Sequence, residues 1–338
     1  MANKPDRLEW PDVAKGICIL AVIAGHMGIA QINRVVFLWH LPVFFLISGF
    51  FLRKKPLLTI IKEKALRLLG PYYLTCLAII FISVLKDMIR RVSPLPGLAA
   101  WIGASLYGAG DNWTHPIEIK AIGAIWFLWA LFFAYVIAGY LADRKYGLIF
   151  SVVIAFLGWG SITWTGYWLP LSIQAGMLSS LYLMIGYEAK KHNFSPDSIP
   201  LGITIIFGII SVLGIYVFKG YWLVHNYMGN GWIDFIFSLC FGTVIIVLSN
   251  RIIKSFKMVS VFFRYFGRNS LLILCLHLIE LNMFHIKSVM ERIAGYLSIE
   301  PETAAFIALI YIAKVLYVFM GTFILNRITF IRRIFGGI

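Results

Sequence analysis

The sequence predicts an all-α polytopic membrane protein with about ten transmembrane helices and both termini in the cytoplasm. Of its 338 residues, 60% are hydrophobic and only 13% are charged, whereas a soluble domain is nearer half apolar and a quarter charged. Apolar stretches of about 20 residues, the length of one spanning helix, recur along the chain. No polar stretch is long enough for a separate soluble domain, so residues 1–338 are expected to form a single integral-membrane domain.

The apolar stretches give the expected spans in order. A short connection centred near Asn33 joins the first two, which should therefore be antiparallel neighbours. The longest outer loop, about residues 90–121, contains an apolar segment from Trp101 to Tyr107 that is expected to lie in the membrane interface. The ten expected spans are residues 13–31, 35–52, 68–89, 122–142, 147–165, 171–189, 200–218, 231–250, 268–287 and 303–325.

The basic residues set the expected orientation. An even number of spans places both termini on one side, and 20 of the 30 Lys and Arg residues, from Lys4 to Arg333, fall on that side, against eight on the other. Lys15 and Lys314 are placed in the membrane. Because cytoplasmic loops carry an excess of Lys and Arg, both termini are expected in the cytoplasm. The net charge of +15 is therefore an orientation signal, and nucleic acid is not expected as a partner.

The sequence lacks the patterns of several common sites. Its four cysteines lie inside apolar stretches without a Cys-x-x-Cys pair, so they are expected to be small buried side chains. It has no Gly-rich nucleotide loop, His-Glu-x-x-His motif, Gly-x-Ser-x-Gly motif or EF-hand spacing. No metal cofactor is expected. The cysteines are Cys18, Cys76, Cys240 and Cys275.

The first span carries two ionisable side chains, Lys15 and His26. They are eleven residues apart, so they project from nearly the same face of a helix, ~16 Å apart along its axis. Ionisable groups buried in a membrane are costly, which makes a functional role the default hypothesis. The structural alternative is a lysine that reaches the membrane surface and a histidine that hydrogen-bonds a neighbouring helix.

The second span places His40 two residues before Pro42. His26 and His40 each lie seven residues from Asn33, so in helical spans they reach the same depth. Pro42 cannot donate a backbone hydrogen bond and crowds the carbonyl of Leu38, which opens the helix beside His40. The pattern predicts a polar pocket. The alternative is that His40 pairs with the freed carbonyl and only stabilises the kink.

A basic segment enters the third span, and its Lys64 and Arg67 are three residues apart on one face. With Lys15 near the same membrane surface they would form a cradle for phosphates. Attraction to anionic lipid headgroups is the alternative for such a cluster.

The ninth span contains His277 and, three residues later on the same face, Glu280. A carboxylate at that depth is expected to pair with a cation or a histidine, or to be protonated. The two residues either hold helices together or take part in chemistry. His115, His192 and His225 fall in predicted loops and receive no role.

Four motifs in order resemble those of the membrane acyltransferase-3 family, particularly its sugar O-acetylase (fucose 4-O-acetylase-like) branch. The first helix of that family carries Asp-x-x-(Arg/Lys)-Gly and an (Arg/Lys)-x10-His spacing, matched here by Asp12, Lys15, Gly16 and His26. The other matches are His-x-Pro-x-Phe-Phe-x-x-Ser-Gly at residues 40–49, Trp-Phe-Leu at 126–128, and Gly-(Arg/Lys)-x-Ser-Leu followed by histidine at 267–277.

The resemblance implies transfer of an acyl group, usually acetyl from cytoplasmic acetyl-CoA or another acyl-CoA, to a hydroxyl of a cell-surface glycan or its precursor. It also implies a multi-pass protein of the bacterial cytoplasmic (inner) membrane, in contact with membrane lipids. The family's Arg-x-x-Arg appears here as Lys64-x-x-Arg67, which keeps the charge but loses one bidentate fork. The sequence leaves open the acceptor, the acyl chain and the side of the membrane on which the acceptor is modified. It also leaves open the oligomeric state, with a homo-oligomer among the possibilities.

On this interpretation His26 is the general base, since imidazole titrates near neutral pH and can take the hydroxyl proton. His40 would position the acceptor or orient His26, and His277 with Glu280 would complete the polar cavity. Direct transfer is preferred to a transient acyl-histidine. The expected donor-binding residues are Lys15, Lys64, Arg67 and Arg268, with Asp12 orienting Lys15.

Two other classes of function stay open. A transporter or flippase of a lipid-linked glycan would move its substrate without consuming an acyl donor. Such transporters often contain paired broken helices, and the sequence has one such break, at Pro42. A non-catalytic subunit of a synthase would tolerate every histidine substitution.

Overall fold

A computed structural model describes residues 7–296 and 303–336, and the chain is 77% helical. In the described part of the chain the only strands are a short antiparallel pair, β1 (Tyr221–Trp222) and β2 (Tyr227–Met228). The predicted all-α class is therefore confirmed. Lys4, one of the cations placed in the cytoplasm, lies outside the described residues.

Several helices are long and apolar enough to cross a membrane. Among the described residues there are five: α2 (Ala30–Val36) continued by α3 (His40–Phe50), the helix Leu57–Ile89, α8 (Gly147–Thr165), α11 (Trp232–Ser255) and α15 (Ala304–Leu325). A bent pair, α12 (Lys257–Arg268) with the helix Ser270–Phe284, makes a sixth candidate. The protein is a multi-pass membrane protein, while the count of ten spans and the side of each terminus stay predictions.

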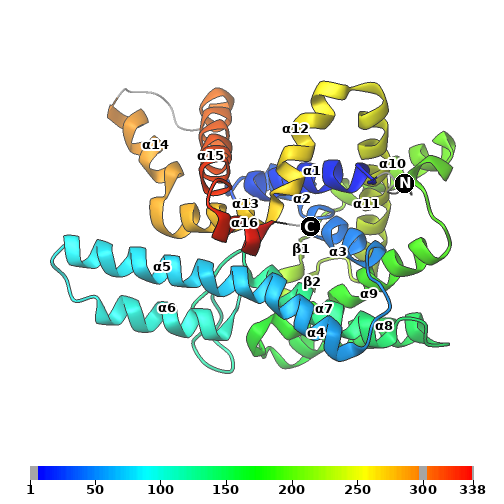
Figure 1. The fold of residues 1–338 in the computed structure, drawn as a ribbon, viewed down its shortest axis with the longest axis horizontal. Helices are drawn as coiled ribbons and strands as arrows, with labels where there is room; N and C mark the ends of the chain where they lie inside the picture. The colour runs from blue at the N-terminus through cyan, green and yellow to red at the C-terminus, as the bar shows by residue number, and fades with distance from the viewer. Residues whose placement is uncertain (1–6, 297–302, 337–338) are drawn as a thin grey trace.

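The remaining helices are shorter or more polar, and Figure 1 shows how they surround the centre of the molecule. The helix Leu57–Ile89 consists of α4 (Leu57–Lys64), a π-helical turn (Ala65–Leu69) and α5 (Gly70–Ile89). The helix after Asn269 consists of α13 (Ser270–Ile279) and a π-helical turn (Glu280–Phe284). The others are α1 (Trp10–Gly25), α6 (Leu95–Tyr107), α7 (Trp126–Leu141), α9 (Ile173–Lys191), α10 (Leu201–Tyr216), α14 (Ile286–Tyr296) and α16 (Thr329–Phe335), with 3-10 turns at 170–172, 196–198 and 223–225.

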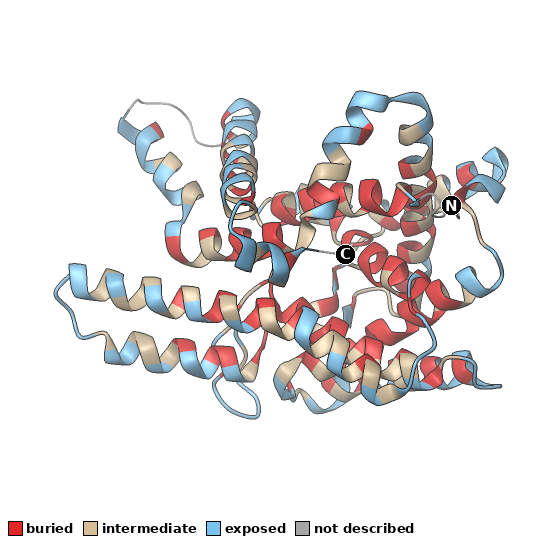
Figure 2. Ribbon diagram, in the orientation of Figure 1, coloured by how far each residue is buried: buried red, intermediate tan, exposed pale blue. Residues whose placement is uncertain are grey.

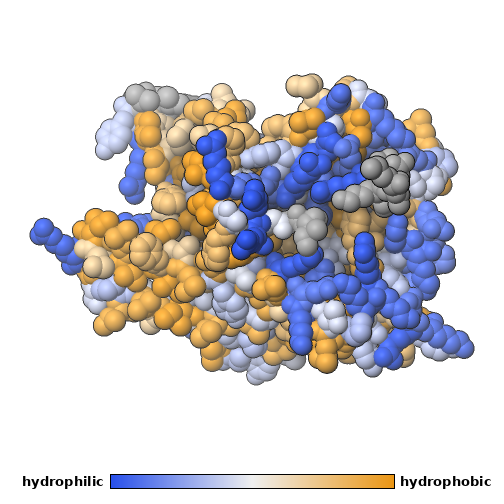
Figure 3. Space-filling model, in the orientation of Figure 1, coloured by the Kyte–Doolittle hydropathy of each residue, from blue (hydrophilic) through white to orange (hydrophobic). Residues whose placement is uncertain are grey.

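The buried residues gather around α1, α3, α7 and α9, at the centre of Figure 2. Hydrophobic side chains cover α5 and α6 in Figure 3, as expected for helices in contact with lipid. Hydrophilic side chains gather instead on the face where α16 lies. All four cysteines are buried and unpaired, as expected.

Glycine allows α1 and α12 to touch along their backbones. A Cβ added to Gly16 would lie 2.0 Å from the carbonyl oxygen of Phe263, and one added to Gly267 would lie 1.7 Å from that of Asp12. Small residues at helix contacts are typical of membrane proteins, where close backbone packing replaces hydrophobic burial as the driving force. This contact fixes α1 against the segment that leads into α13.

Three predicted segments differ in detail from the structure. The second span is not continuous, because the chain breaks at residues 37–39 and α3 begins at His40, which puts Pro42 in a first turn, where proline is tolerated. The predicted inner loops at 53–67 and 251–268 are largely helical. The ninth span bends by 67° at Asn269, so it is not one straight helix.

Candidate active site

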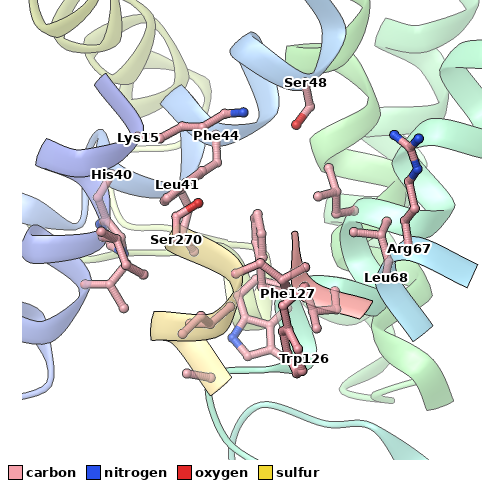
Figure 4. A pocket seen from close by; sticks show the side chains of 18 of the residues that line it. Lys15, His40, Leu41, Phe44, Ser48, Arg67, Leu68, Trp126, Phe127 and Ser270 are labelled. Atoms are coloured by element: carbon pink, nitrogen blue, oxygen red, sulfur yellow. The ribbon is translucent and has the colours of Figure 1, made fainter. Parts of the chain in front are cut away.

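A cavity of about 290 Å³, with mostly apolar walls and several polar side chains, lies among α1, α3, α7, α13 and the π-helical turn after α4. In Figure 4, Lys15 and His40 lie on one side of it and Arg67 on the other. The structure thus brings together residues that the sequence places on the first two spans and in the segment that enters the third. The predicted site residues that line this central cavity are Lys15, His26, His40, Lys64 and Arg67.

His26 directly follows the last residue of α1 and is held by the last turn of that helix. Its Nδ1 donates to the carbonyl oxygen of Val22 at 2.8 Å. A carbonyl can only accept, so the proton is on Nδ1 and Nε2 is the nitrogen left to accept a proton. This is the arrangement that a general base requires.

His40 begins α3 and makes the same kind of contact. Its Nδ1 donates to the carbonyl oxygen of Val36 at 2.6 Å. The structural alternative named the carbonyl of Leu38 as the partner of His40, but the helix breaks before His40 and the ring bonds the Val36 carbonyl. The Val36 carbonyl also accepts from the backbone N–H of Trp39 at 3.3 Å, so the imidazole gives it a second hydrogen bond.

His277 lies behind His26 and does not line the central cavity. The two rings pack edge to face, with centroids 5.3 Å apart and an interplanar angle of 74°. Nδ1 of His277 is 3.3 Å from Oε2 of Glu280, and both side chains are almost fully buried. His277 therefore touches the candidate base from the protein side.

Glu280 is paired with a residue to which sequence reasoning gave no role. Nζ of Lys314, on α15, donates to both carboxylate oxygens at 2.7 Å. The expectation that Glu280 pairs with a cation or a histidine is confirmed, since it has both partners. The signal for Lys314 was its charge inside an apolar span, but the sequence did not show which helix it faces.

Asp12 and Arg268 form a pair of their own. Oδ2 of Asp12 accepts from Nε of Arg268 at 3.0 Å and also from Arg7 at 3.0 Å. The hydrogen bonds of Asp12 among the described residues go to Arg268 and Arg7, because the contact between α1 and α12 brings Arg268 to the carboxylate, so the orientation of Lys15 by Asp12 stays a prediction. Arg268 does not line the central cavity, whereas Lys15 does and has no ion-pair partner in the part of the chain described.

Two contributors to the central cavity come from elements that the sequence did not connect with it. Nζ of Lys64 lies 3.6 Å from the centroid of the Tyr135 ring on α7, a cation–π geometry. Phe335 of α16 closes another part of the wall and is 8% exposed. Trp126 and Phe127 of the Trp-Phe-Leu motif also line it.

Two further cavities adjoin the central one. A basic hollow of about 800 Å³, lined by Arg7, Arg53 and Lys190 among others, shares Lys15 with it. A distal cavity of about 550 Å³ shares His26 with it. Lys15 and His26 therefore stand at opposite ends of the central cavity, about three turns apart on α1.

The fold and the site define a multi-pass α-helical membrane protein with a cavity enclosed by its helices and lined in part by polar side chains. The acyltransferase-3 family model, described as an acyltransferase domain, matches residues 8–327. The chain belongs to this family and is a membrane acyltransferase, which implies an acyl donor and a hydroxyl acceptor. Comparisons with curated proteins and with solved structures found no match. Among the described residues no group of three or more His, Cys, Asp and Glu is arranged to hold a metal.

Proposed function

We propose that this acyltransferase moves an acetyl group from acetyl-CoA to a hydroxyl of a cell-surface glycan or its precursor, in the bacterial inner membrane. The observation that carries the proposal is the position of His26. With Nδ1 bound to a carbonyl, it lines a cavity that also contains three cations, Lys15, Lys64 and Arg67. Family membership favours this enzyme over a glycan transporter.

The cations suit an acyl-CoA donor, whose phosphates are anionic and whose thioester lies at the end of a long arm. Lys64 and Arg67 lie beside the central cavity, and Lys15 joins it to the basic hollow with Arg53 and Lys190. Clustered cations bind phosphates through charge-assisted hydrogen bonds. The phosphates would lie at the basic hollow and the arm would extend through the central cavity towards His26.

Transfer then needs one proton acceptor. The acceptor hydroxyl oxygen attacks the thioester carbonyl carbon as its proton passes to Nε2 of His26. The tetrahedral intermediate collapses with cleavage of the carbon–sulfur bond, and the departing thiolate takes the proton from the imidazolium to give CoA. The Val22 carbonyl, which holds Nδ1–H, keeps the ring in the required orientation throughout.

The other buried groups would position the base. His277 packs against the His26 ring, and Glu280 with Lys314 fixes His277 in turn. His40 faces the cavity from α3 and would contact the substrates. Positioning by neighbouring side chains matters because small displacements of reacting groups reduce rates strongly.

The test uses the purified protein in lipid nanodiscs, radiolabelled acetyl-CoA and envelope fractions of the host. His26→Gln should reduce transfer by a factor of about 10² to 10⁴, the usual contribution of a general base, with the Kd for acetyl-CoA unchanged. His192→Gln is the control, because that side chain is 78% exposed and contacts Glu188 at the surface. Wild-type turnover in His26→Gln would remove His26 from the mechanism.

The donor site has its own test. Lys15→Met should weaken acetyl-CoA binding about tenfold or more, since a hydrogen bond to a charged group contributes roughly 1.5–3 kcal/mol. Calorimetric titration measures the change. An unaltered Kd would show that the donor does not contact Lys15, and movement of labelled glycan without acetyl-CoA consumption would favour a transporter.

A further inference from the structure

The distal cavity lies on the other side of His26 from the cations of the central cavity. His26, Ala124 and Trp126 line both cavities, so they form the boundary between them. Most of the remaining distal wall comes from two loops, around residues 110–111 and 222–225, and from the end of the ninth span, with Phe37 and Gly123 completing it. The sequence places both loops on the outer side of the membrane.

A hydrogen-bonded pair joins these two loops across the mouth of the cavity. Nε2 of His225 donates to Oδ2 of Asp111 at 3.2 Å, although the residues are 114 positions apart. The His225 ring packs against Trp113 and Trp168, with centroids 5.3 and 5.0 Å away. The His225 imidazole is therefore fixed in place.

The Asp111 carboxylate is ionised and available to a ligand. The hydrogen bond from His225 lowers the pKa of Asp111 below its ordinary value, and the backbone N–H of Asn112 acts in the same direction. The Asp111 side chain is 59% exposed. An ionised carboxylate only accepts hydrogen bonds, so its natural ligands are hydroxyl and amide groups.

The charge of the distal cavity is opposite to that of the donor side. No lysine or arginine lines it among the residues described, and Asp111 would repel an anion. The Asn282 amide adds a second polar group, while Trp126 and Trp222 supply aromatic faces. Small-molecule sites combine mostly apolar walls with a few such polar groups, in volumes of ~300–1,000 Å³.

We propose that the distal cavity is the acceptor subsite and that it takes an electrically neutral sugar unit. Asp111 accepts hydrogen bonds from its hydroxyls, the Asn282 amide donates to them or accepts from them, and Trp222 covers the apolar face of its ring. One hydroxyl then meets Nε2 of His26 from the side opposite to the donor. The inference rests on the proposed function for the chemistry at His26, but it concerns only recognition of the acceptor.

The experiment separates acceptor binding from donor binding. Envelope glycans are divided by anion exchange into neutral and acidic pools, and each serves as acceptor for acetyl-CoA with protein in nanodiscs. The neutral pool should gain acetyl groups. Asp111→Asn should raise the KM for that pool about tenfold or more, with kcat changed less than twofold and the Kd for acetyl-CoA unchanged. Trp222→Ala, which removes an aromatic face of the cavity, should raise the same KM.

Asp197→Asn is the matched control, because that carboxylate is 56% exposed and paired with Lys254 but lines none of the three cavities. The unchanged Kd for acetyl-CoA shows that each variant is folded. Preferential acetylation of the acidic pool, or a wild-type KM in both Asp111→Asn and Trp222→Ala, would overturn the inference while leaving the proposed function intact. Failure of the wild type to bind acetyl-CoA and transfer from it would overturn both.

Discussion

The buried ion pair between Lys314 and Glu280 gives a prediction that does not depend on the reaction. Both carboxylate oxygens lie 2.7 Å from Nζ, and the two side chains are 2% and 1% exposed. Lys314→Met removes the cation and leaves a buried carboxylate with His277 and the backbone N–H of Ile286 as its remaining partners. Removing one partner of a buried pair costs about 3–5 kcal/mol, because the remaining charge is uncompensated. We expect a loss of that size in the free energy of unfolding.

The double variant Lys314→Met with Glu280→Gln should recover most of the loss, since no buried charge remains. Denaturant titration of the detergent-solubilised protein, followed by tryptophan fluorescence, measures all members of the cycle. Lys254→Met is the matched control, because it breaks a lysine–aspartate pair whose side chains are 58% and 56% exposed. An exposed pair contributes roughly 0–1 kcal/mol.

Two results would refute this reasoning. If Lys314→Met loses no more stability than Lys254→Met, then the Lys314–Glu280 pair is not isolated from water, contrary to what its low exposure indicates. If the losses in Lys314→Met and Glu280→Gln simply add in the double variant, the two side chains do not interact energetically.

The remaining predictions concern helix packing and the donor cavity. Gly267→Ala places a Cβ 1.7 Å from the Asp12 carbonyl oxygen, so overpacking should cost about 1–3 kcal/mol or more and lower the thermal unfolding midpoint. Gly208→Ala, whose added Cβ would have nothing within 4 Å, should leave the midpoint unchanged. Equal midpoints in the two variants would contradict the close contact of α1 and α12. Phe335→Ala widens the central cavity, so the rate with butyryl-CoA relative to acetyl-CoA should rise about tenfold, given ~0.8 kcal/mol per buried methylene. Phe330→Ala, on the same helix but 60% exposed, should leave that ratio unchanged, and an unchanged ratio in Phe335→Ala would show that the acyl chain lies elsewhere.

Much of the candidate site follows from local patterns in the sequence. The spacing of Lys15 and His26 fixes both on one side of a single helix, whatever that helix contacts. The predicted span at residues 147–165 coincides with α8, because length and hydropathy alone determine where a helix can cross a membrane. The three-residue spacing of Lys64 and Arg67 likewise places both at the central cavity.

Partners that are distant along the chain could not be predicted in the same way. Hydropathy shows that Lys314 is in the membrane but not that it faces Glu280, and the spacing of Asp12 from Lys15 does not show that Arg268 reaches the Asp12 carboxylate. His225 received no role because nothing in its loop shows that it lies beside Asp111.

The sequence by itself therefore determined that the chain is an all-α membrane protein and which ionisable groups share a helical face, since composition and local spacing suffice for both. Tertiary packing decided which of those groups meet, because an apolar helix can present any side to its neighbours and close contacts such as that of Gly16 with Phe263 select one. The cavities on either side of His26 form only when the helices pack with these sides facing one another.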